Sequence, residues 1–451
     1  MVFSSLIFLF RFLPMALLLL FLTPKKYRNL LLFTLSLIFY AWGEVRYIFI
    51  MFISVVLDYF TSQGIKKYQH HPWIPKAMLM ISIVGNLGML FFFKYLGFVG
   101  SLFSLDLPTL TLPLGISFYT FQTMSYTIDV YRGKVEAEDN IIDFGAFVCL
   151  FPQLIAGPIV KYSQIAYELK HRVLTMDKFE SGLKLFLLGL ASKVLLANNI
   201  GMMWDDIIRL PISSLSTVTA WLGTMAFGFQ IYFDFSGYSL MAIGLGSMLG
   251  FNFPQNFNYP YISKSMTEFW NRWHMTLGSW FKEYVYIPLG GNRKGTTRQI
   301  FNLLIVWFLT GFWHGAAFNF ILWGLFFFVL LTIEKLVLFR WLNQHPFLSR
   351  LYFIFFILIG WAVFAISDLT LLSQYLTAMF ALQSSNQWIY FISNYGVVLL
   401  FCLIFSTDIP KKIVRSVTFP ALETSMVTML FLFSIAYLVD SSYNPFLYFR
   451  F

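Results

Sequence analysis

Long apolar runs separated by short polar segments dominate the pattern of this 451-residue chain. Runs of about 17 to 25 apolar residues are long enough for a helix to cross the hydrocarbon core of a membrane. The pattern predicts about twelve such helices, near residues 2–22, 29–43, 46–62, 77–99, 112–131, 183–200, 216–235, 300–317, 319–338, 351–368, 388–406 and 424–440. The predicted fold class is therefore all-α, a polytopic membrane bundle with additional re-entrant or interfacial helices.

The polar segments carry most of the basic residues, and this bias predicts the orientation of the chain. Short cytoplasmic loops are enriched in Lys and Arg. With the N-terminus outside, the inward segments hold 25 of the 31 Lys and Arg residues; these segments are 24–28, 63–76, 131–184, 251–299, 335–350 and 411–415. We therefore expect both termini to lie outside the cytoplasm.

Composition excludes a soluble protein. Hydrophobic residues make up 58% of the chain and charged residues only 12%, far from the soluble average. The net charge of +10 follows from the loop bias, and no soluble domain offers the basic face that nucleic-acid binding needs. We interpret residues 1–22 as a retained span, not a signal peptide, because Arg11 interrupts the run and Lys25 and Lys26 follow it. One membrane domain over residues 1–451 is expected.

Three stretches are too polar, or too rich in Pro and Gly, to be simple spans. They are Leu112–Phe118, Phe151–Pro158 and 251–299. Irregular backbone at membrane depth is tolerated only inside protein or beside water, so we expect Phe151–Pro158 to be a re-entrant or interfacial element. The segment 251–299, on the predicted cytoplasmic side, interleaves Trp and Tyr with Lys and Arg. That mixture predicts an amphipathic helix at the level of the lipid headgroups.

A Gly290-Gly291 turn in this segment is followed by Arg293, Lys294 and Arg298. Exposed backbone N–H groups beside cationic side chains can hold a phosphate group. The spacing matches neither a P-loop nor a dinucleotide-binding fingerprint. Contact with a lipid headgroup explains the same residues about equally well, so both alternatives stay open.

Two histidines lie in motifs within this apolar chain, and a titratable side chain at membrane depth is a functional candidate by default. His274 ends the motif Phe269–His274, and His314 belongs to a Trp-His-Gly motif in the helices predicted over 300–338. For His314, a functional role and neutral packing weigh about evenly. For His274, close to the expected membrane interface, packing weighs more.

Glycines flank the second histidine. Gly311 and Gly315 are four residues apart in a predicted helix, so they should share a face that a neighbouring helix can approach closely.

Lys193 and Asp234 also fall in predicted spans. Because pairing would lower their desolvation cost, we expect a structural ion pair.

Other chemistries find no support in the residues. The chain contains no G-x-S-x-G, H-E-x-x-H or C-x-x-C motif. Its two cysteines suggest neither a disulfide nor a metal site, and no metal centre is expected. No matched pair of broken helices marks an inverted-repeat transporter. The residues favour histidine-assisted chemistry in a membrane cavity open to the cytoplasm.

The motifs resemble those of the membrane-bound O-acyltransferase (MBOAT) family. The resemblance rests on Phe269–Leu277, Tyr286–Arg293 and Gly311–Ala317. Four further stretches look like its bacterial branch typified by the membrane subunits that O-acetylate alginate or peptidoglycan, and these are Met1–Ser5, Gly115–Gln122, Asp234–Tyr238 and Asn444–Phe451. The similarity therefore covers the whole chain.

This resemblance implies a helical bundle around a funnel or tunnel, with His314 near its middle and His274 as the second family histidine. It implies an O-acyltransferase of the bacterial cytoplasmic (inner) membrane that takes acetyl groups from a cytoplasmic donor, acetyl-CoA, and passes them outward. A secreted or membrane-anchored SGNH-type partner would then esterify hydroxyls of an exported polysaccharide such as alginate or a cell-wall glycan. Membrane lipids surround the chain, and no bound cofactor is implied.

A neutral imidazole can take the proton of a hydroxyl that attacks a thioester carbonyl, and we assign this role to His314 as a hypothesis. His274 would orient the donor, support the funnel or shuttle a proton. The cations that would attract the anionic donor are Arg272, Lys282, Arg293, Lys294 and Arg298. The candidate substrate-binding set also includes Trp273, Asn292 and Trp313.

Two alternatives remain from the sequence. The first is the family's D-alanyl transferase branch, which modifies teichoic acids and uses an acyl carrier protein. The second is a transporter or a non-catalytic scaffold in which His314 only packs.

Overall fold

The computed structural model of the chain describes residues 1–105, 107, 110–155, 157–416, 420–440, 443–445 and 447. Ala156, Phe446 and Tyr448–Phe451, which belong to motifs discussed above, lie outside them. The described residues form helices and connecting turns, without a strand. Seven helical stretches are long and apolar enough to cross a membrane. The predicted all-α, polytopic class is confirmed, whereas the number of about twelve spans stays a prediction.

The contacts within the chain define two compact units. The first comprises Met1–Leu187 and Tyr238–Pro254, and the second comprises Leu188–Gly237 and Gln255–Phe451. Both units are discontinuous in sequence, and two helices run from one unit into the other. The prediction of a single membrane domain remains a prediction.

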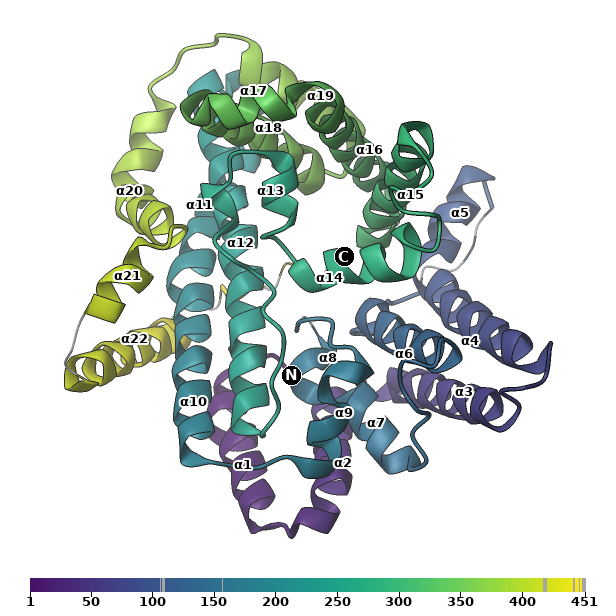
Figure 1. Cartoon of the computed structure of the whole chain (residues 1–451). Helices are drawn as coiled ribbons and strands as arrows, with labels where there is room; N and C mark the ends of the chain where they lie inside the picture. Colours follow the sequence, from purple (N-terminus) through teal and green to yellow (C-terminus); the bar gives the residue numbers. More distant parts are fainter. Residues whose placement is uncertain are drawn as a thin grey trace. The chain divides into compact units, whose positions relative to one another are not determined.

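The first unit holds the helices near the N-terminus (Figure 1). Their bounds are α1 Leu13–Leu22, α2 Arg28–Glu44, α3 Ile48–Lys67, α4 Ile74–Leu90, α5 Leu96–Leu102, α6 Ile116–Tyr131, α7 Ile141–Cys149, α8 Phe151–Leu154, α9 Tyr162–His171 and α10 Met176–Ala191. Helices α3, α4 and α6 pack against one another, and α2 packs against α7. The end of α10 belongs to the second unit.

A buried polar network joins α3, α4 and α6. The carboxylate of Asp58 accepts hydrogen bonds from the Ser82 hydroxyl, from Asn86 Nδ2 at 2.6 Å and from Thr127 Oγ1 at 2.7 Å. The Thr123 hydroxyl donates to Asn86 Oδ1 at 3.2 Å. All five side chains are buried. Such contacts hold helices together where lipid tails remove the hydrophobic drive for association.

Two of the predicted irregular stretches meet in this unit. Gly115, at the start of α6, has φ +73, and a β-carbon there would collide with the carbonyl oxygen of Leu154. Glycine is therefore required both by the left-handed backbone and by the close approach. The stretch Phe151–Leu154 forms the short, buried helix α8. Its predicted re-entrant position stays a prediction.

The second unit holds most of the later helices. Their bounds are α11 Asn198–Ile208, α12 Thr217–Met248, α13 Met266–Trp270, α14 Met275–Phe281, α15 Thr296–His314, α16 Phe318–Ile333, α17 Phe339–Gln344, α18 Pro346–Ala365, α19 Leu369–Phe380, α20 Gln387–Phe405, α21 Ile409–Ser416 and α22 Pro420–Asp440. Helix α12 continues into the first unit after Gly237. Helices α15 and α16 lie side by side, and α18 packs on α16 (Figure 1).

The predicted ion pair is confirmed in the second unit. Lys193 Nζ lies 2.8 Å from Asp234 Oδ1, and both side chains are only 2% exposed. Lys193 also donates to Asn198 Oδ1 at 2.8 Å and to the carbonyl oxygen of Pro445. The backbone N–H of Leu447 donates to Asp234 Oδ2 at 2.9 Å. The pair therefore ties the C-terminal segment to the helices.

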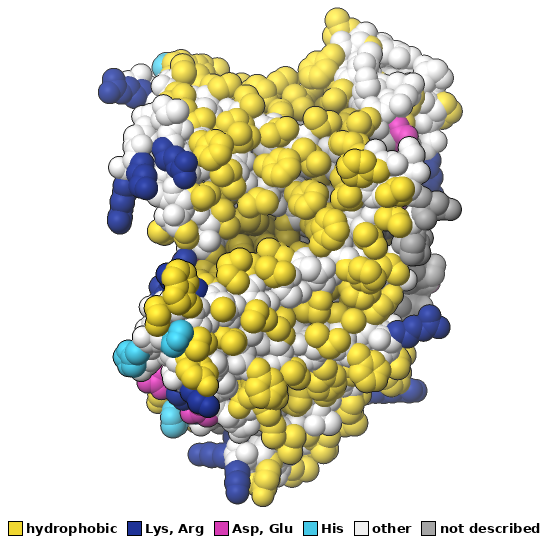
Figure 2. Space-filling model, turned by 90° about the vertical axis from the view of Figure 1, so that its right-hand side faces the viewer, with side chains coloured by type: hydrophobic (Ala, Val, Ile, Leu, Met, Phe, Trp, Pro, Cys, Tyr) yellow, Lys and Arg dark blue, Asp and Glu magenta, His cyan; other side chains and the backbone are white. Residues whose placement is uncertain are grey.

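Hydrophobic side chains cover most of the face shown in Figure 2, and charged side chains gather toward its edges. On α3 and α4, large apolar residues such as Phe49, Phe60 and Val84 are exposed. Water-soluble proteins rarely expose apolar surface so extensively. These outer helix faces are suited to contact with lipid.

Candidate active site

The segment 251–299 does not form the single amphipathic helix that the sequence predicted. It contains two short helices, α13 and α14, separated by a turn at His274. Trp273, Trp280 and Tyr284 are buried rather than exposed at a membrane surface. The ring of Trp273 lies 5.0 Å from that of Trp361 on α18. Packing among aromatic side chains buries these residues inside the second unit. The sequence had instead predicted that they lie among lipid headgroups.

His274 is 2% exposed and therefore lies buried inside the second unit. Its Nδ1 lies 3.0 Å from Asn256 Oδ1, and its ring packs edge-on against Phe235 at 4.7 Å. His274 lies outside the helices that are long enough to span a membrane. Burial lowers the pKa of His274 to about 3, because the charged form loses its hydration. The imidazole is therefore neutral at pH 7.

Helix α15 ends at His314, three residues earlier than the predicted helix. Gly315 follows in an extended conformation, so Gly311 and Gly315 do not share a helix face as predicted. Gly311 faces the backbone of α16, where its β-carbon would collide with the carbonyl oxygen of Phe320 and lie 3.2 Å from the α-carbon of Gly324. The close helix approach is therefore made by Gly311 and Gly324.

Aromatic rings surround His314, which is 5% exposed. Its ring lies 5.0 Å from that of Trp313, 5.1 Å from Trp323 on α16 and 5.2 Å from Phe364 on α18. Trp313 also lies 6.3 Å from the ring of His274. The structure therefore brings the two histidine motifs together inside the second unit, with both imidazole rings near the indole of Trp313.

Substitution of Gly311 tests how closely the position of His314 depends on the contact between α15 and α16. In Gly311→Ala, the added methyl group must push the helices apart. Overpacking of this kind typically lowers the free energy of unfolding by about 1–3 kcal/mol. We expect a lower melting temperature of the purified protein and lower transferase activity. The matched control is Gly396→Ala on α20, whose β-carbon meets only Ile392 at 3.6 Å. Equal behaviour of the two variants would contradict the close approach.

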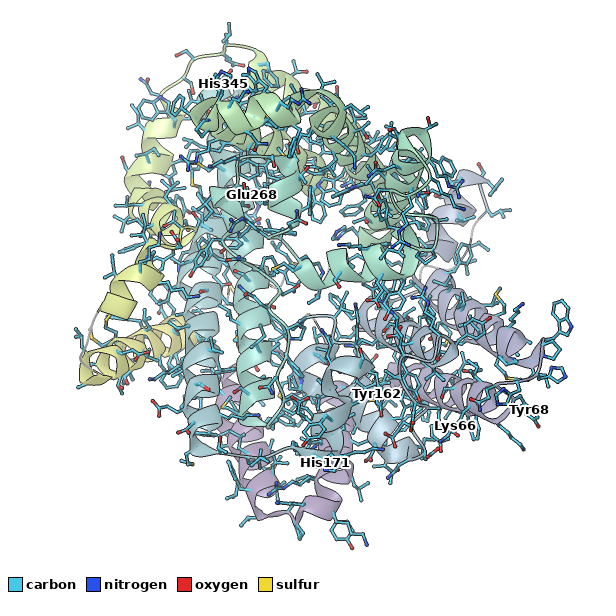
Figure 3. The ribbon with its side chains drawn as sticks, viewed as in Figure 1. Lys66, Tyr68, Tyr162, His171, Glu268 and His345 are labelled. Atoms are coloured by element: carbon cyan, nitrogen blue, oxygen red, sulfur yellow. The ribbon has the colours of Figure 1, made fainter. Side chains whose placement is uncertain are left out.

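The predicted substrate-binding cations divide into two groups. Arg272 is paired with Glu268, with Nη2 2.9 Å from Oε1, and it donates to the carbonyl oxygen of Asn258 at 3.1 Å. Figure 3 labels Glu268. The second group contains the four exposed cations, which are Lys282, Arg293, Lys294 and Arg298. Asn292 is exposed as well. Only this second group has free access to a soluble anion.

The Gly290-Gly291 turn is present, with φ +108 and +58. Its amides are used within the turn, because Gly290 N–H donates to Ile287, Gly291 N–H to Tyr286 and Arg293 N–H to Gly290. The expectation of exposed backbone N–H groups at these three residues is therefore wrong. Any anion held here would rely on the cationic side chains.

Comparison with known proteins decides the class of this arrangement. The model of the MBOAT, membrane-bound O-acyltransferase family, matches residues 134–375, a stretch that includes both histidine motifs. The chain belongs to the MBOAT family. The predicted enzyme class, a membrane O-acyltransferase, is confirmed.

Curated MBOAT relatives match along much or all of the chain. It is 38% identical to the probable alginate O-acetylase AlgI of Azotobacter vinelandii over 100% of both proteins. It is 35% identical to the peptidoglycan O-acetyltransferase of Helicobacter pylori over 74% of this chain and 70% of the relative. A teichoic acid D-alanyltransferase of Streptococcus thermophilus is 30% identical over 52% of this chain and 59% of the relative.

Sequence reasoning missed three residues of this MBOAT site. Asn256 precedes His274 by eighteen positions and has no motif of its own. Trp323 and Phe364 lie in apolar runs, and in such runs the sequence indicates only a packing role for an aromatic residue. The indole Nε1 of Trp323 is buried and has no hydrogen-bond partner among the described residues. Their contacts with the histidines depend on tertiary structure, which periodicity does not report.

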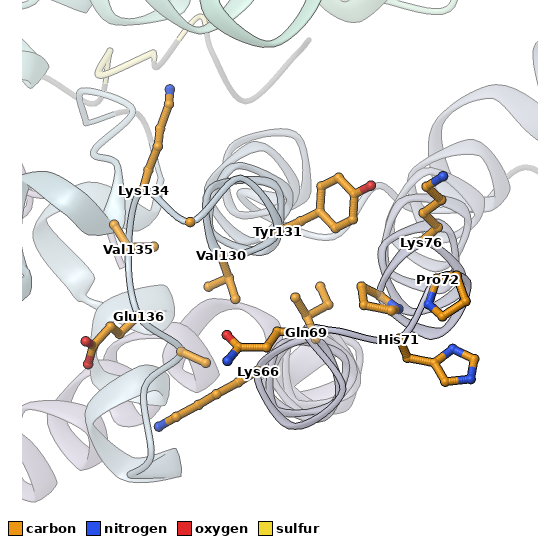
Figure 4. A pocket seen from close by; sticks show the side chains of 14 residues that line it. Lys66, Gln69, His71, Pro72, Lys76, Val130, Tyr131, Lys134, Val135 and Glu136 are labelled. Atoms are coloured by element: carbon orange, nitrogen blue, oxygen red, sulfur yellow. The ribbon is translucent and has the colours of Figure 1, made fainter.

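A separate pocket of about 910 Å³ lies in the first unit (Figure 4). The ends of α3, α4 and α6 line it, and it contains no predicted site residue. Two of its lysines are already paired, Lys66 with Asp139 at 2.6 Å and Lys134 with Asp129 at 3.8 Å. No group of three or more His, Cys, Asp or Glu able to hold a metal occurs in the described part of the chain.

Proposed function

We propose that this MBOAT chain moves acetyl groups from cytoplasmic acetyl-CoA across the inner membrane for O-acetylation of an exported polysaccharide. The relatives named for alginate and peptidoglycan O-acetylation support the acetyl group and the glycan acceptor. The observation that carries the proposal is the pair of buried histidines whose rings both lie near the indole of Trp313. Both termini lie outside, and a secreted or membrane-anchored SGNH-type partner delivers the acetyl group to the glycan.

His314 acts as the general base of the transfer. A hydroxyl oxygen attacks the thioester carbonyl, and the imidazole takes the hydroxyl proton as the C–O bond forms. When the C–S bond breaks, the imidazolium returns the proton to the departing thiolate. The rings around His314 keep water out of this step. The buried indole N–H of Trp323 is available to the oxyanion that develops on the carbonyl.

The exposed cations draw the donor to the protein. Acetyl-CoA carries three phosphate groups, and a cluster of like charge raises the rate of encounter with an anion. In Lys282→Gln/Arg293→Gln/Lys294→Gln, we expect the KM for acetyl-CoA to rise about tenfold at low salt, with a weaker salt dependence and little change in kcat. The measurement is initial acetyl-transfer rates in membranes at two ionic strengths.

A matched control removes cations elsewhere. Lys25 and Lys26 are exposed in the turn before α2, so Lys25→Gln/Lys26→Gln alters charge in the first unit, whereas the candidate site residues belong to the second. The same rise in KM in both proteins would assign the effect to general surface charge. An unchanged KM in the triple variant would return these residues to the lipid-headgroup interpretation.

The D-alanyl branch is the second candidate, supported by the more distant relative named for that activity. It requires a carrier-bound acyl donor and a cytoplasmic docking surface. Membranes that transfer label from acetyl-CoA, with no gain when a D-alanyl carrier protein is supplied, would exclude it. Label transferred only from the carrier would replace the acetyl proposal.

A further inference from the structure

Asn256 holds the turn that carries His274. Its side-chain oxygen Oδ1 lies 3.0 Å from His274 Nδ1, 3.2 Å from the backbone nitrogen of Thr276 and 2.8 Å from Thr276 Oγ1. Its backbone carbonyl accepts from the N–H of Met275 at 2.9 Å. One asparagine therefore contacts three consecutive residues of the turn.

The contact with Thr276 identifies the amide oxygen of Asn256. A backbone nitrogen can only donate, so the atom that faces the Thr276 N–H must be the oxygen and not the nitrogen of the amide. The same oxygen faces His274 Nδ1. An amide oxygen only accepts, and therefore Nδ1 must carry the hydrogen of this bond.

The tautomer of His274 follows from this bond. In a neutral imidazole one nitrogen carries the hydrogen and the other is an acceptor. With the hydrogen on Nδ1, the acceptor is Nε2. This atom is buried and has no hydrogen-bond partner among the described residues. A buried acceptor without a partner destabilises the fold unless another group supplies a donor.

The backbone at His274 is also strained. Its φ of +44 and ψ of +52 lie in the left-handed region, which is unfavourable for a residue with a β-carbon. Such strain persists only where the surroundings hold it, and here the bonds from Asn256 do so. This conformation aims the ring at Phe235 and Trp313. The fold therefore maintains an unfavourable backbone conformation at His274, and this conformation orients the imidazole.

We propose that Asn256 is a positioning residue, which fixes His274 as the Nδ1–H tautomer and leaves Nε2 as the acceptor for an O–H, N–H or S–H group of the reacting molecules. This inference rests on the proposed acetyl transfer for its functional meaning. The tautomer itself does not depend on that activity.

The proposal can be tested by adding a single charge beside His274. Among the described residues, the groups that face its ring are Phe235 from α12, Asn256 and Phe257 from the preceding segment, and Trp313 from α15, and none of these carries a charge. Arg272, two residues earlier, is paired with Glu268. In Asn256→Asp, the new carboxylate still accepts from Nδ1 and from Thr276, and it adds one negative charge beside the ring.

The sign of the effect follows from that charge. Burial holds the pKa of His274 near 3, so the native protein keeps a neutral imidazole through the acidic range. A carboxylate beside the ring stabilises the imidazolium and raises its pKa. The acid limb of the pH–rate profile should therefore move to higher pH in Asn256→Asp, and a pKa raised to about 7 would make the rate at pH 6 about tenfold lower than at pH 8.

The experiment combines that profile with solid-state NMR of the full chain in lipid bilayers, carrying ¹⁵N-labelled histidine. The His274→Ala protein identifies the signal of His274. We expect a protonated Nδ1 and an unprotonated Nε2 in the native protein and in Thr276→Val, the control that removes the hydroxyl bond to Asn256 and keeps the backbone bond of residue 276. In Asn256→Leu, which has no acceptor, the Nε2–H tautomer should become populated.

A native signal with hydrogen on Nε2, or an unchanged tautomer in Asn256→Leu, would overturn the inference. A purely structural Asn256 would lower the abundance of Asn256→Leu and Thr276→Val without moving the pH profile of Asn256→Asp. Failure of the proposed function looks different, because the native membranes would then transfer no acetyl group while the tautomer signals kept their expected pattern.

Discussion

Replacement of His314 by alanine is expected to lower acetyl transfer by about 10²- to 10⁴-fold, the usual contribution of a general base. The histidine is buried among Trp313, Trp323 and Phe364, so solvent water cannot replace the lost imidazole as the base. The measurement is transfer of labelled acetyl groups from acetyl-CoA in membranes of matched protein abundance, with the secreted partner supplied.

Two further variants separate chemistry from packing. His314→Gln fills most of the space of the ring but has no comparable basicity, so it should be nearly as inactive as the alanine variant. His345→Ala removes a histidine that is exposed at the end of α17 (Figure 3) and should retain native activity. Near-native transfer by His314→Gln would remove His314 from the chemistry and support the scaffold interpretation.

The elements of this fold that the sequence predicted are those set by hydropathy. An apolar run must satisfy its own backbone in lipid, and a helix is the local way to do so. The pairing of Lys193 with Asp234 was predictable for a similar reason, because two opposite charges in apolar spans reduce their cost by meeting. Both arguments need only the residue types and their surroundings along the chain.

The parts that escaped prediction depend on contacts between distant residues. An aromatic residue such as Trp273 can lie at a membrane interface or in an aromatic interior, and its neighbours in sequence do not decide between the two. Gly311 was correctly marked for close helix contact, but its partner proved to be Gly324 across the turn to α16. Asn256 gained its role only because the chain folds back to place it against His274.

The largest expected loss of stability comes from breaking the buried ion pair of Lys193 and Asp234. In Lys193→Met, the carboxylate of Asp234 stays buried without its cation, which typically costs about 3–5 kcal/mol. The bonds from Lys193 to Asn198 and to the carbonyl oxygen of Pro445 are lost as well. We expect a large drop in the melting temperature of the purified protein in detergent and release of the C-terminal segment to limited proteolysis.

The double variant Lys193→Met/Asp234→Leu distinguishes the pair from either charge alone. With both charges removed, no uncompensated ion remains in the interior, and the double variant should be more stable than Lys193→Met although it carries one more substitution. Lys412→Met, which breaks an exposed pair with Asp408, should change stability by no more than about 1 kcal/mol. Additive losses in the double variant would mean that each side chain acts through its separate bonds to the C-terminal segment.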